Sequence, residues 1–232
     1  EYLTEMTDIV LEEGGIIDKY QGDAIMAEFG VPIAVPDHAD IAVRTGLKMQ
    51  RRLKELRQEW NRKGLPMLYC RIGINTGPMI VGNMGSIQIL DYTVIGDAVN
   101  LASRLEGASK RYGTFLMIPE FTCEYLLPGV FRMRVLDVIK VKGKSKAVKV
   151  FEVYGEISDT IDPDHELYYQ NYHEGFEAYL SRDFAHALDK FQSALSLRPD
   201  DSAAKEMVAR VDSLDPDLLP PDWDGSIALT TK

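Results

Sequence analysis

Cysteine is scarce in this chain, and long apolar runs are absent. Only Cys70 and Cys123 occur in 232 residues, and they lack the spacing of a metal site, so we expect both to be reduced core residues of a cytosolic protein. No apolar stretch approaches the roughly 20 residues of a membrane-spanning helix, and we see no signal peptide. We therefore expect a cytoplasmic domain. Any membrane anchor of the parent protein would lie upstream, and these residues leave that open.

An excess of basic residues is also lacking, since 36 acidic side chains outnumber 26 basic ones and give a formal net charge of −10. Residues 1–156 hold 20 acidic and 20 basic side chains, whereas residues 157–232 hold 16 acidic and 6 basic. This change near Glu156 predicts a boundary between two parts of the chain. Neither part has the basic surplus that is typical of nucleic-acid-binding proteins, which disfavours that class.

The hydrophobic pattern predicts an α+β domain in the first two thirds of the chain. A helix over residues 2–13 is followed by a hairpin that turns at residues 20–23, and a long amphipathic helix begins after Pro36. A helix followed at once by a hairpin is typical of α+β folds. Residues 67–75 read as a buried strand. Further strands are predicted at 88–95, 114–118, 131–141 and 147–154.

The most informative stretch is LDYTVIGDAVNLASRLE, residues 90–106, which reads as a strand, a Gly-Asp turn and a helix. Asp97 is predicted to cap that helix. Asn100 and Arg104 are four residues apart and so share one helix face, with Thr93 leading in from the strand. Taken alone, Arg104 is better explained by a surface salt bridge. The residues predicted to face the core are Leu101, Leu105 and Ala108.

Asp23 follows the glycine of the predicted hairpin turn, where a carboxylate projects from a fixed backbone. One carboxylate together with substrate phosphates and water is a usual way to hold Mg²⁺. Taken alone, however, an aspartate in a Gly-Asp pair is more often a plain turn residue. Lys19, four residues earlier, would by itself be read as a solvated charge.

Three strings together are far more specific: residues 90–106, DKYQGDAIMAEFG at 18–30 and RIGINTG at 71–77. In unbroken order they resemble the catalytic domain of class III nucleotidyl cyclases, over residues 1–155. The resemblance implies a ferredoxin-like α+β domain that converts ATP or GTP to the cyclic nucleotide and pyrophosphate. In this family a strand with a second metal-binding aspartate precedes the helix in which this chain begins. We therefore expect the domain to lack its first strand here, and the chain alone to make little cyclic nucleotide.

The resemblance also implies which residues bind metal, ribose and phosphates. Asp23 would bind one or both of two Mg²⁺ or Mn²⁺ ions, the second aspartate being absent from this chain. Asn100 would orient the ribose and Arg104 would stabilise the α-phosphoryl group. Lys142, with Lys144 as a possible substitute, would hold the terminal phosphates. In the family these groups converge only across a head-to-tail homodimer, which gives two equivalent sites.

Lys19 and Thr93 stand at the positions that select the base in this family. Adenylate cyclases have lysine with aspartate or threonine there, whereas guanylate cyclases have glutamate and cysteine. The chemistry agrees, because lysine can only donate and adenine N1 accepts, whereas guanine presents a donor at N1. The sequence therefore predicts an adenylate cyclase acting on ATP. A guanylate cyclase, or a non-catalytic regulatory module that kept the fold, is the alternative.

Residues 165–213 form a different unit, joined by a linker at 156–164 and followed by an extended tail at 214–232. The unit resembles a tetratricopeptide repeat, although Asn171 and Ala178 depart from its tryptophan and tyrosine positions. Because one helix pair cannot bury its own face, it must pack on the cyclase domain, on a second copy, or on repeats of a protein partner. Trp223 is the expected anchor of the tail. The matching positions are Gly175, Ala187, Phe191, Ala194 and Pro199.

Overall fold

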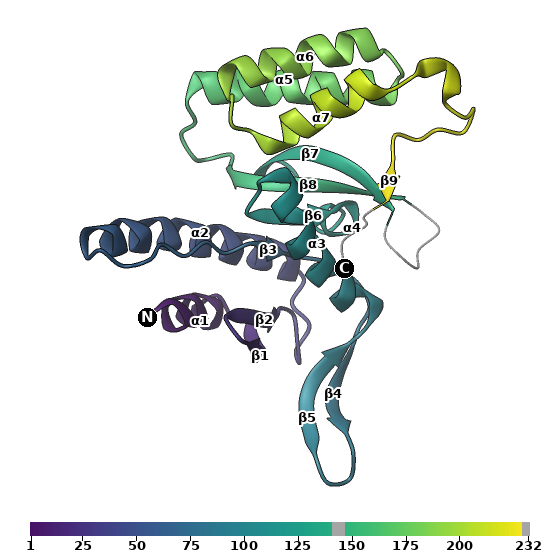
Figure 1. Ribbon diagram of the computed structural model, residues 1–232. Coiled ribbons are helices and arrows are strands. Elements are labelled where there is room, and N and C mark those ends of the chain that lie inside the picture. Colours follow the sequence, from purple (N-terminus) through teal and green to yellow (C-terminus); the bar gives the residue numbers. More distant parts are fainter. Residues whose placement is uncertain (141–146, 229–232) are drawn as a thin grey trace.

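The computed structural model describes residues 1–140 and 147–228. Its first part alternates helices and strands, and its last part is helical, as Figure 1 shows. The helices are α1 (Tyr2–Glu12), α2 (His38–Arg62), α3 (Asp97–Tyr112), α4 (Glu120–Cys123), α5 (Pro163–Leu180), α6 (Phe184–Leu197) and α7 (Ser202–Ser213), with a 3-10 turn η1 (Pro216–Leu218).

The strands form a five-stranded mixed sheet and two separate hairpins. In the main sheet the order is β3-β6-β8-β7-β9, with β3–β6 and β7–β9 parallel and the two central pairs antiparallel. One hairpin is β1–β2 and the other is β4–β5. The strands are β1 (Ile16–Gln21), β2 (Ala24–Glu28), β3 (Ile72–Gly73), β4 (Ile80–Gly85), β5 (Leu90–Ile95), β6 (Leu116–Pro119), β7 (Phe131–Lys140), β8 (Ala147–Glu156) and β9 (Ile227–Ala228).

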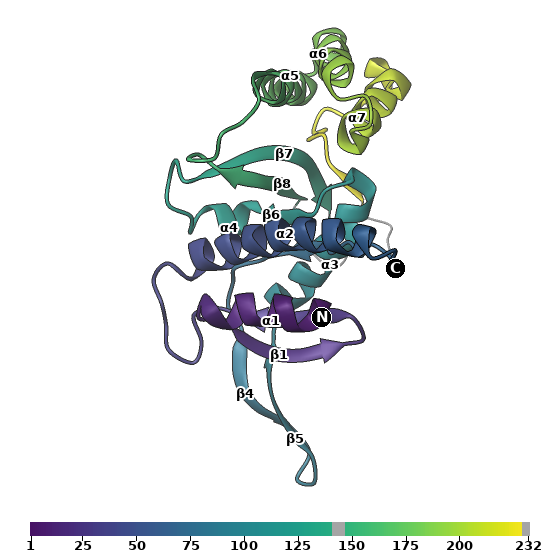
Figure 2. The ribbon, with the colours of Figure 1, turned by 90° about the vertical axis from the view of Figure 1, so that its left-hand side faces the viewer.

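Helices cover both faces of the main sheet. Helices α5, α6 and α7 lie on one face, while α2 and α3 lie on the other (Figures 1 and 2). Helix α1 and the β1–β2 hairpin lie beyond α2, and the β4–β5 hairpin projects away from the body in both views. The mixed α+β domain that the hydrophobic pattern predicts is therefore confirmed.

The long helix α2 connects the two halves of the core on its side of the sheet. Its apolar residues recur at helical spacing, so one face can be buried along its whole length. Toward its N-terminus Val43 and Leu47 pack on β6 and β7, and toward its C-terminus Leu53, Leu56 and Trp60 pack against α1. Both ends of the helix are thereby fixed relative to the sheet and the hairpin.

The prediction of a buried strand over residues 67–75 is wrong. Only Ile72 and Gly73 form a strand, β3, and the preceding residues have no regular structure. Met67 and Tyr69 are 48 % and 59 % exposed. Within residues 1–140 and 147–228, β3 pairs with β6 alone, so it is an edge strand with one hydrogen-bonding neighbour. An apolar run cannot specify how many strands will flank it, which is why the pattern was misleading.

The start of α3 also differs from the prediction by one residue. Gly96, not Asp97, is the N-cap, and Asp97 is the first helical residue without a side-chain capping bond. A side chain at Gly96 would meet the carbonyl oxygen of Pro78 at 3.1 Å. The segment that leads into β4 therefore passes so close to this junction that glycine is favoured there. The Asp97 carboxylate still lies in the first turn, where the helix dipole favours negative charge. Leu101, Leu105 and Ala108 are buried, as predicted.

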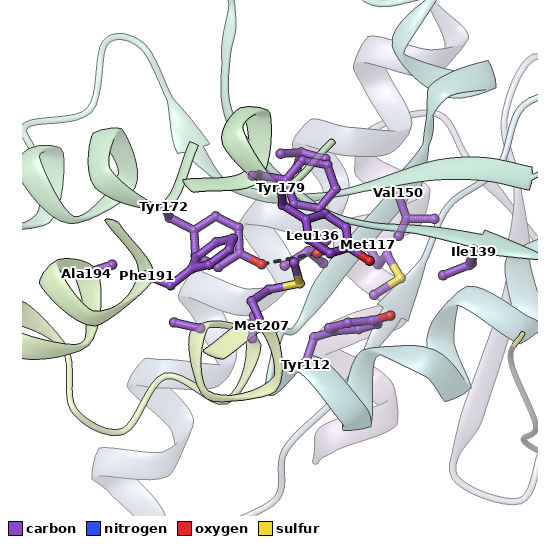
Figure 3. Close-up of a cluster of buried hydrophobic side chains, with 14 of the residues drawn as sticks. Tyr112, Met117, Leu136, Ile139, Val150, Tyr172, Tyr179, Phe191, Ala194 and Met207 are labelled. Atoms are coloured by element: carbon purple, nitrogen blue, oxygen red, sulfur yellow. Dashed lines mark hydrogen bonds between the residues drawn. The ribbon is translucent and has the colours of Figure 1, made fainter. Parts of the chain in front are cut away.

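The C-terminal helices pack on the α+β part of the same chain, which is one of the three arrangements that the sequence allows. Figure 3 shows Tyr172, Tyr179, Phe191 and Met207 of these helices meeting Leu136 and other residues of the sheet in one buried cluster. The Tyr172 hydroxyl donates to the Leu136 carbonyl at 3.1 Å (Figure 3). A shared core of this kind stabilises both parts together.

The tail returns to the sheet. After η1, the chain adds β9 as a short parallel strand beside the end of β7. Trp223 makes edge contacts with the rings of Tyr179 and Phe184, at centroid distances of 5.0 and 5.6 Å, and so anchors the tail as predicted. No helix in the described part of the chain combines the length and apolar character needed to cross a bilayer.

Candidate functional site

An irregularity in β1 organises the first group of site residues. Ile17 pairs with Ala27 and Lys19 pairs with Met26, so Asp18 is an extra residue that has no partner on β2. In a regular strand, neighbouring side chains point to opposite faces. A bulge re-aims side chains, and here the side chains of Asp18 and Lys19 both reach Thr93 on β5.

Asp18, Lys19 and Thr93 are joined by two hydrogen bonds and one ion pair. The Lys19 Nζ donates to Thr93 Oγ1 at 3.0 Å and lies 3.1 Å from Asp18 Oδ1. Thr93 Oγ1 donates to Asp18 Oδ2 at 2.7 Å, and the Val94 amide donates to the same oxygen at 3.2 Å. The Asp18 side chain is 1 % exposed, whereas the Lys19 side chain is 38 % exposed and opens toward the surface. The structure thus brings together the two residues predicted to select the base, 74 positions apart.

Glu28 on β2 is the fourth member of this cluster and contacts Asp18. It is buried, and burial followed by its hydrogen bond to Asp18 raises the pKa of Glu28 to about 7. Burial alone would raise the pKa of Asp18 as well, but hydrogen bonds from Thr93, Lys19 and Glu28 outweigh it and lower the pKa of that carboxyl. Asp18 is therefore the member of the pair that ionises first and balances the charge of Lys19, whereas Glu28 keeps its proton below about pH 7.

Asp18 and Glu28 were missed in the sequence reasoning. Asp18 lies beside Lys19 in sequence, but alternation along a strand would place the two side chains on opposite faces. The only available signal was an acidic residue beside apolar neighbours in each strand, Asp18 after Ile16 and Ile17, and Glu28 after Ala27. That signal does not reveal the bulge on which their role depends.

Asn100 and Arg104 lie one turn apart on the exposed face of α3, as their spacing predicts. The opposite face of α3 packs very closely on β3. A side chain at Gly73 would come within 2.2 Å of the Ala102 carbonyl oxygen and 2.5 Å of the Glu106 amide nitrogen. This close approach holds α3 against the sheet, and α3 follows directly from the strand that carries Thr93. Three of the predicted site residues therefore belong to one rigid β5–α3 unit.

Asp23 lies in the two-residue loop between β1 and β2, where Gln21 pairs with Ala24 across the turn. Gly22 supplies the positive φ of +64° that such tight hairpins need. The Asp23 carboxylate is exposed, as a ligand to a metal carried by a substrate must be. No group of three metal-ligating side chains occurs in residues 1–140 and 147–228. A lone, fixed and exposed carboxylate suits Mg²⁺ or Mn²⁺ that is held mainly by phosphate and water oxygens.

Lys142 and Lys144, predicted to contact the terminal phosphates, fall outside the described residues. The remaining predicted residues divide into three groups: the Lys19–Thr93 pair, the Asn100–Arg104 face of α3, and Asp23 at the tip of the β1–β2 hairpin. The structure thus combines a mixed α+β domain, a lysine-threonine pair and an amide-guanidinium helix face, as the resemblance predicts.

Comparisons with known proteins agree with this geometry. Residues 4–154 match the family described as the adenylate and guanylate cyclase catalytic domain, so the chain belongs to that family. A crystal structure of the adenylyl cyclase CyaB from P. aeruginosa is 40 % identical, with a TM-score of 0.62, covering 69 % of this chain and 82 % of that one. A structure of the guanylyl cyclase Cya2 is 36 % identical, with a TM-score of 0.59, covering 67 % and 77 %.

Curated relatives carry the same likeness. An adenylate cyclase of Anabaena cylindrica is 40 % identical over 159 residues, which are 66 % of this chain and 31 % of the relative. Adenylate cyclase 1 of Rhizobium meliloti (strain 1021) is 36 % identical over 157 residues, 68 % of this chain and 24 % of the relative. The chain thus spans about a third or less of the length of these relatives.

Proposed function

We propose that the protein is an adenylate cyclase that converts ATP to 3′,5′-cyclic AMP and pyrophosphate for intracellular signalling. The observation that carries this proposal is the 3.0 Å hydrogen bond between Lys19 and Thr93. Neither residue is remarkable alone, yet the fold places a donor and an acceptor side by side at the half-exposed edge of the β1–β2 hairpin. Lys19 donates to adenine N1, and Thr93 accepts from the exocyclic amino group.

The remaining residues act on ribose and phosphates in this proposal. Asn100 orients the ribose so that its 3′-hydroxyl lies in line with the α-phosphorus. The hydroxyl oxygen bonds to that phosphorus as the bond to the pyrophosphate oxygen breaks, and pyrophosphate leaves. Arg104 stabilises the charge that grows on the α-phosphoryl oxygens, a role suited to a planar, permanently charged guanidinium. Lys142 holds the terminal phosphates.

Asp23 would hold Mg²⁺ or Mn²⁺ that arrives with the triphosphate. Two such ions, when bound, polarise the attacking hydroxyl and neutralise phosphate charge. The position of Asp23 supports this role, because the hairpin loop fixes the backbone and leaves the carboxylate open to solvent. In the family's pattern a second metal-binding aspartate stands on a strand before the helix that corresponds to α1.

We propose a head-to-tail homodimer in which one protomer supplies Asp23, and the other supplies Lys19, Thr93, Asn100, Arg104 and Lys142. The resemblance to class III cyclases, in which these groups converge across a dimer, supports it. We further propose that residues 1–155 form the catalytic domain, that residues 156–164 link it to the helices, and that residues 165–213 form a tetratricopeptide-like unit. Gly175 lets Phe191 approach closely, as in such helix pairs. A Cβ atom added at Gly175 would lie 3.1 Å from the Phe191 ring. This unit would align protomers or bind a protein partner, and residues 214–232 would form the tail.

The test is turnover of ATP and GTP by the full-length protein and by Lys19→Glu combined with Thr93→Cys. Wild type should favour ATP. The double variant exchanges donor and acceptor at the base edge, so its preference should move toward GTP. A double variant that is active and keeps the wild-type preference would contradict the assignment.

A guanylate cyclase is the second candidate, because the similar structure of Cya2 is that of a guanylyl cyclase. The same assay decides between them. A non-catalytic scaffold is the third, and Arg104→Ala separates it from both. In an enzyme this change should lower turnover by at least about 100-fold, the size of losing one transition-state donor. In a scaffold, where the full-length wild type shows no turnover, it should leave dimerisation and partner binding unchanged.

A further inference from the structure

We propose that Asp18 is a specificity-determining positioning residue: it accepts the hydrogen bond of the Thr93 hydroxyl and pairs with the Lys19 ammonium, so that Thr93 can offer the base only an acceptor and Lys19 only donors. This inference deepens the proposed function and rests on it. Asp18 would touch neither substrate nor metal. It would act through the two residues that face the base.

The bulge in β1 makes this arrangement possible. Without the extra residue, Asp18 and Lys19 would point to opposite faces of the hairpin. With it, both reach Thr93, and Asp18 also accepts the backbone amide of Val94. The buried carboxylate thus joins the β1–β2 hairpin to β5, which belongs to a different sheet. Bulges of this kind are frequent next to functional sites because they redirect side chains.

Counting donors and acceptors shows what remains for a ligand. Of the three N–H donors of the Lys19 ammonium, one is hydrogen-bonded to Thr93, and the ammonium also lies 3.1 Å from Asp18 Oδ1 as an ion pair. The Thr93 hydroxyl has one donor, which Asp18 receives, and two lone pairs, of which Lys19 uses one. Lys19 therefore keeps N–H donors for a ligand, and the Thr93 hydroxyl keeps one acceptor lone pair and no donor.

This remainder matches adenine and opposes guanine. Adenine presents an acceptor at N1 and a donor at its 6-amino group, whereas guanine presents a donor at N1 and an acceptor at O6. A threonine whose proton is free to rotate could donate to O6. With Asp18 in place it cannot do so without giving up a 2.7 Å bond to a buried carboxylate. Asp18 therefore leaves the Thr93 hydroxyl able to accept a hydrogen bond from the base but not to donate one.

The experiment measures kcat/KM of the full-length protein for ATP, GTP and purine riboside triphosphate, which lacks the 6-amino group. Where turnover is absent, calorimetry measures the affinities for the same three nucleotides, and the ratios of these affinities replace the ratios of kcat/KM. Wild type should prefer ATP over the purine analogue by about 5- to 10-fold, the size of one neutral hydrogen bond. In Asp18→Ala this preference should fall to within about 2-fold. The preference for ATP over GTP should fall by at least about 10-fold.

Two further variants separate positioning from folding. In Asp18→Asn the amide oxygen can still accept from Thr93 and Val94, while the amide N–H₂ group faces Lys19. We therefore expect the preference for ATP over the purine analogue to persist and the preference for ATP over GTP to fall by an intermediate factor. The matched control is Asp91→Asn, an exposed carboxylate on the same strand as Thr93, which should leave both ratios unchanged.

Parallel loss of activity toward all three nucleotides in Asp18→Ala, or ratios equal to those of wild type, would overturn the inference. Asp18→Asn supplies the deciding ratios where Asp18→Ala does not fold. A wild-type protein that neither turns over nor prefers ATP would instead overturn the proposed function. The two failures are therefore distinguishable.

Discussion

Arg210 on α7 holds Asp137 on β7 through two parallel hydrogen bonds, of 2.8 and 2.6 Å. The Asp137 side chain is fully buried, and the Tyr112 hydroxyl at the end of α3 donates to it at 2.7 Å. One carboxylate therefore ties together a C-terminal helix, the central sheet and the helix that carries Asn100 and Arg104. The C-terminal helices are joined to the cyclase domain by buried polar contacts as well as by apolar packing.

Replacing Arg210 by methionine should destabilise the protein strongly. The change leaves Asp137 buried with its ion-pair partner removed, and breaking a buried pair in this way costs about 3–5 kcal/mol. Denaturant unfolding of the full-length protein measures the loss. The matched control is Arg51→Met, which removes an exposed pair with Asp159 and should cost about 1 kcal/mol or less. Equal losses in the free energy of unfolding would show that the buried ion pair stabilises the protein no more than the exposed one does.

Replacing Gly73 by alanine should separate β3 from α3. The added carbon would lie 2.2 Å from a backbone oxygen of α3, and backbone cannot yield as a flexible side chain can. We expect a loss of about 3 kcal/mol or more in the free energy of unfolding. Gly107→Ala is the matched control, because Gly107 lies on α3 with open space around it. That change should stabilise the protein by about 0.5–1 kcal/mol, and a similar loss in both variants would contradict the prediction.

The buried Glu28 should make stability depend on pH. Its pKa is raised to about 7 from the usual 4.5, through burial and the hydrogen bond to Asp18, with Lys19 as the facing cation. The folded state therefore holds this proton more tightly than the unfolded state does. The contribution is fully present below about pH 4.5 and is lost as the pH rises through 7, by about 3 kcal/mol at most.

Urea unfolding of wild type and Glu28→Gln between pH 4.5 and 8.5 tests this prediction. Glutamine can donate to Asp18 at every pH, so the variant should gain stability relative to wild type as the pH rises. The exposed Glu12→Gln should follow the wild-type curve. Parallel curves for wild type and Glu28→Gln would show that Glu28 does not titrate in this range.

Trp223→Ala should release the tail without unfolding the helices. Trp223 lies against Tyr179 and Phe184, and the Arg182 guanidinium lies 5.5 Å from its ring centroid. Amide hydrogen exchange over residues 216–228 should become at least about 10-fold faster, since local opening exposes those groups. Exchange in α5 and α6 should change little. Trp60→Ala, at a buried site between α1 and α2, should instead leave the tail protected.

The local sequence determined a large part of this molecule. Apolar spacing located α1, α2 and α3 and placed Leu101, Leu105 and Ala108 in the core, because a helix buries residues three and four apart. The hairpin around Gly22 followed from turn chemistry. The recognisable strings around Lys19, Thr93 and Arg104 predicted the family, which the comparisons then confirmed.

Tertiary structure decided what spacing along the chain cannot express. The bulge that turns Asp18 toward Thr93 depends on how β1 pairs with β2, and the exposure of Met67 and Tyr69 depends on which strands flank β3. Arg210 and Asp137 meet across 73 positions because the C-terminal helices fold back over the sheet. Periodicity reports which face of an element is buried, whereas the partners of that face are fixed only when distant elements pack together.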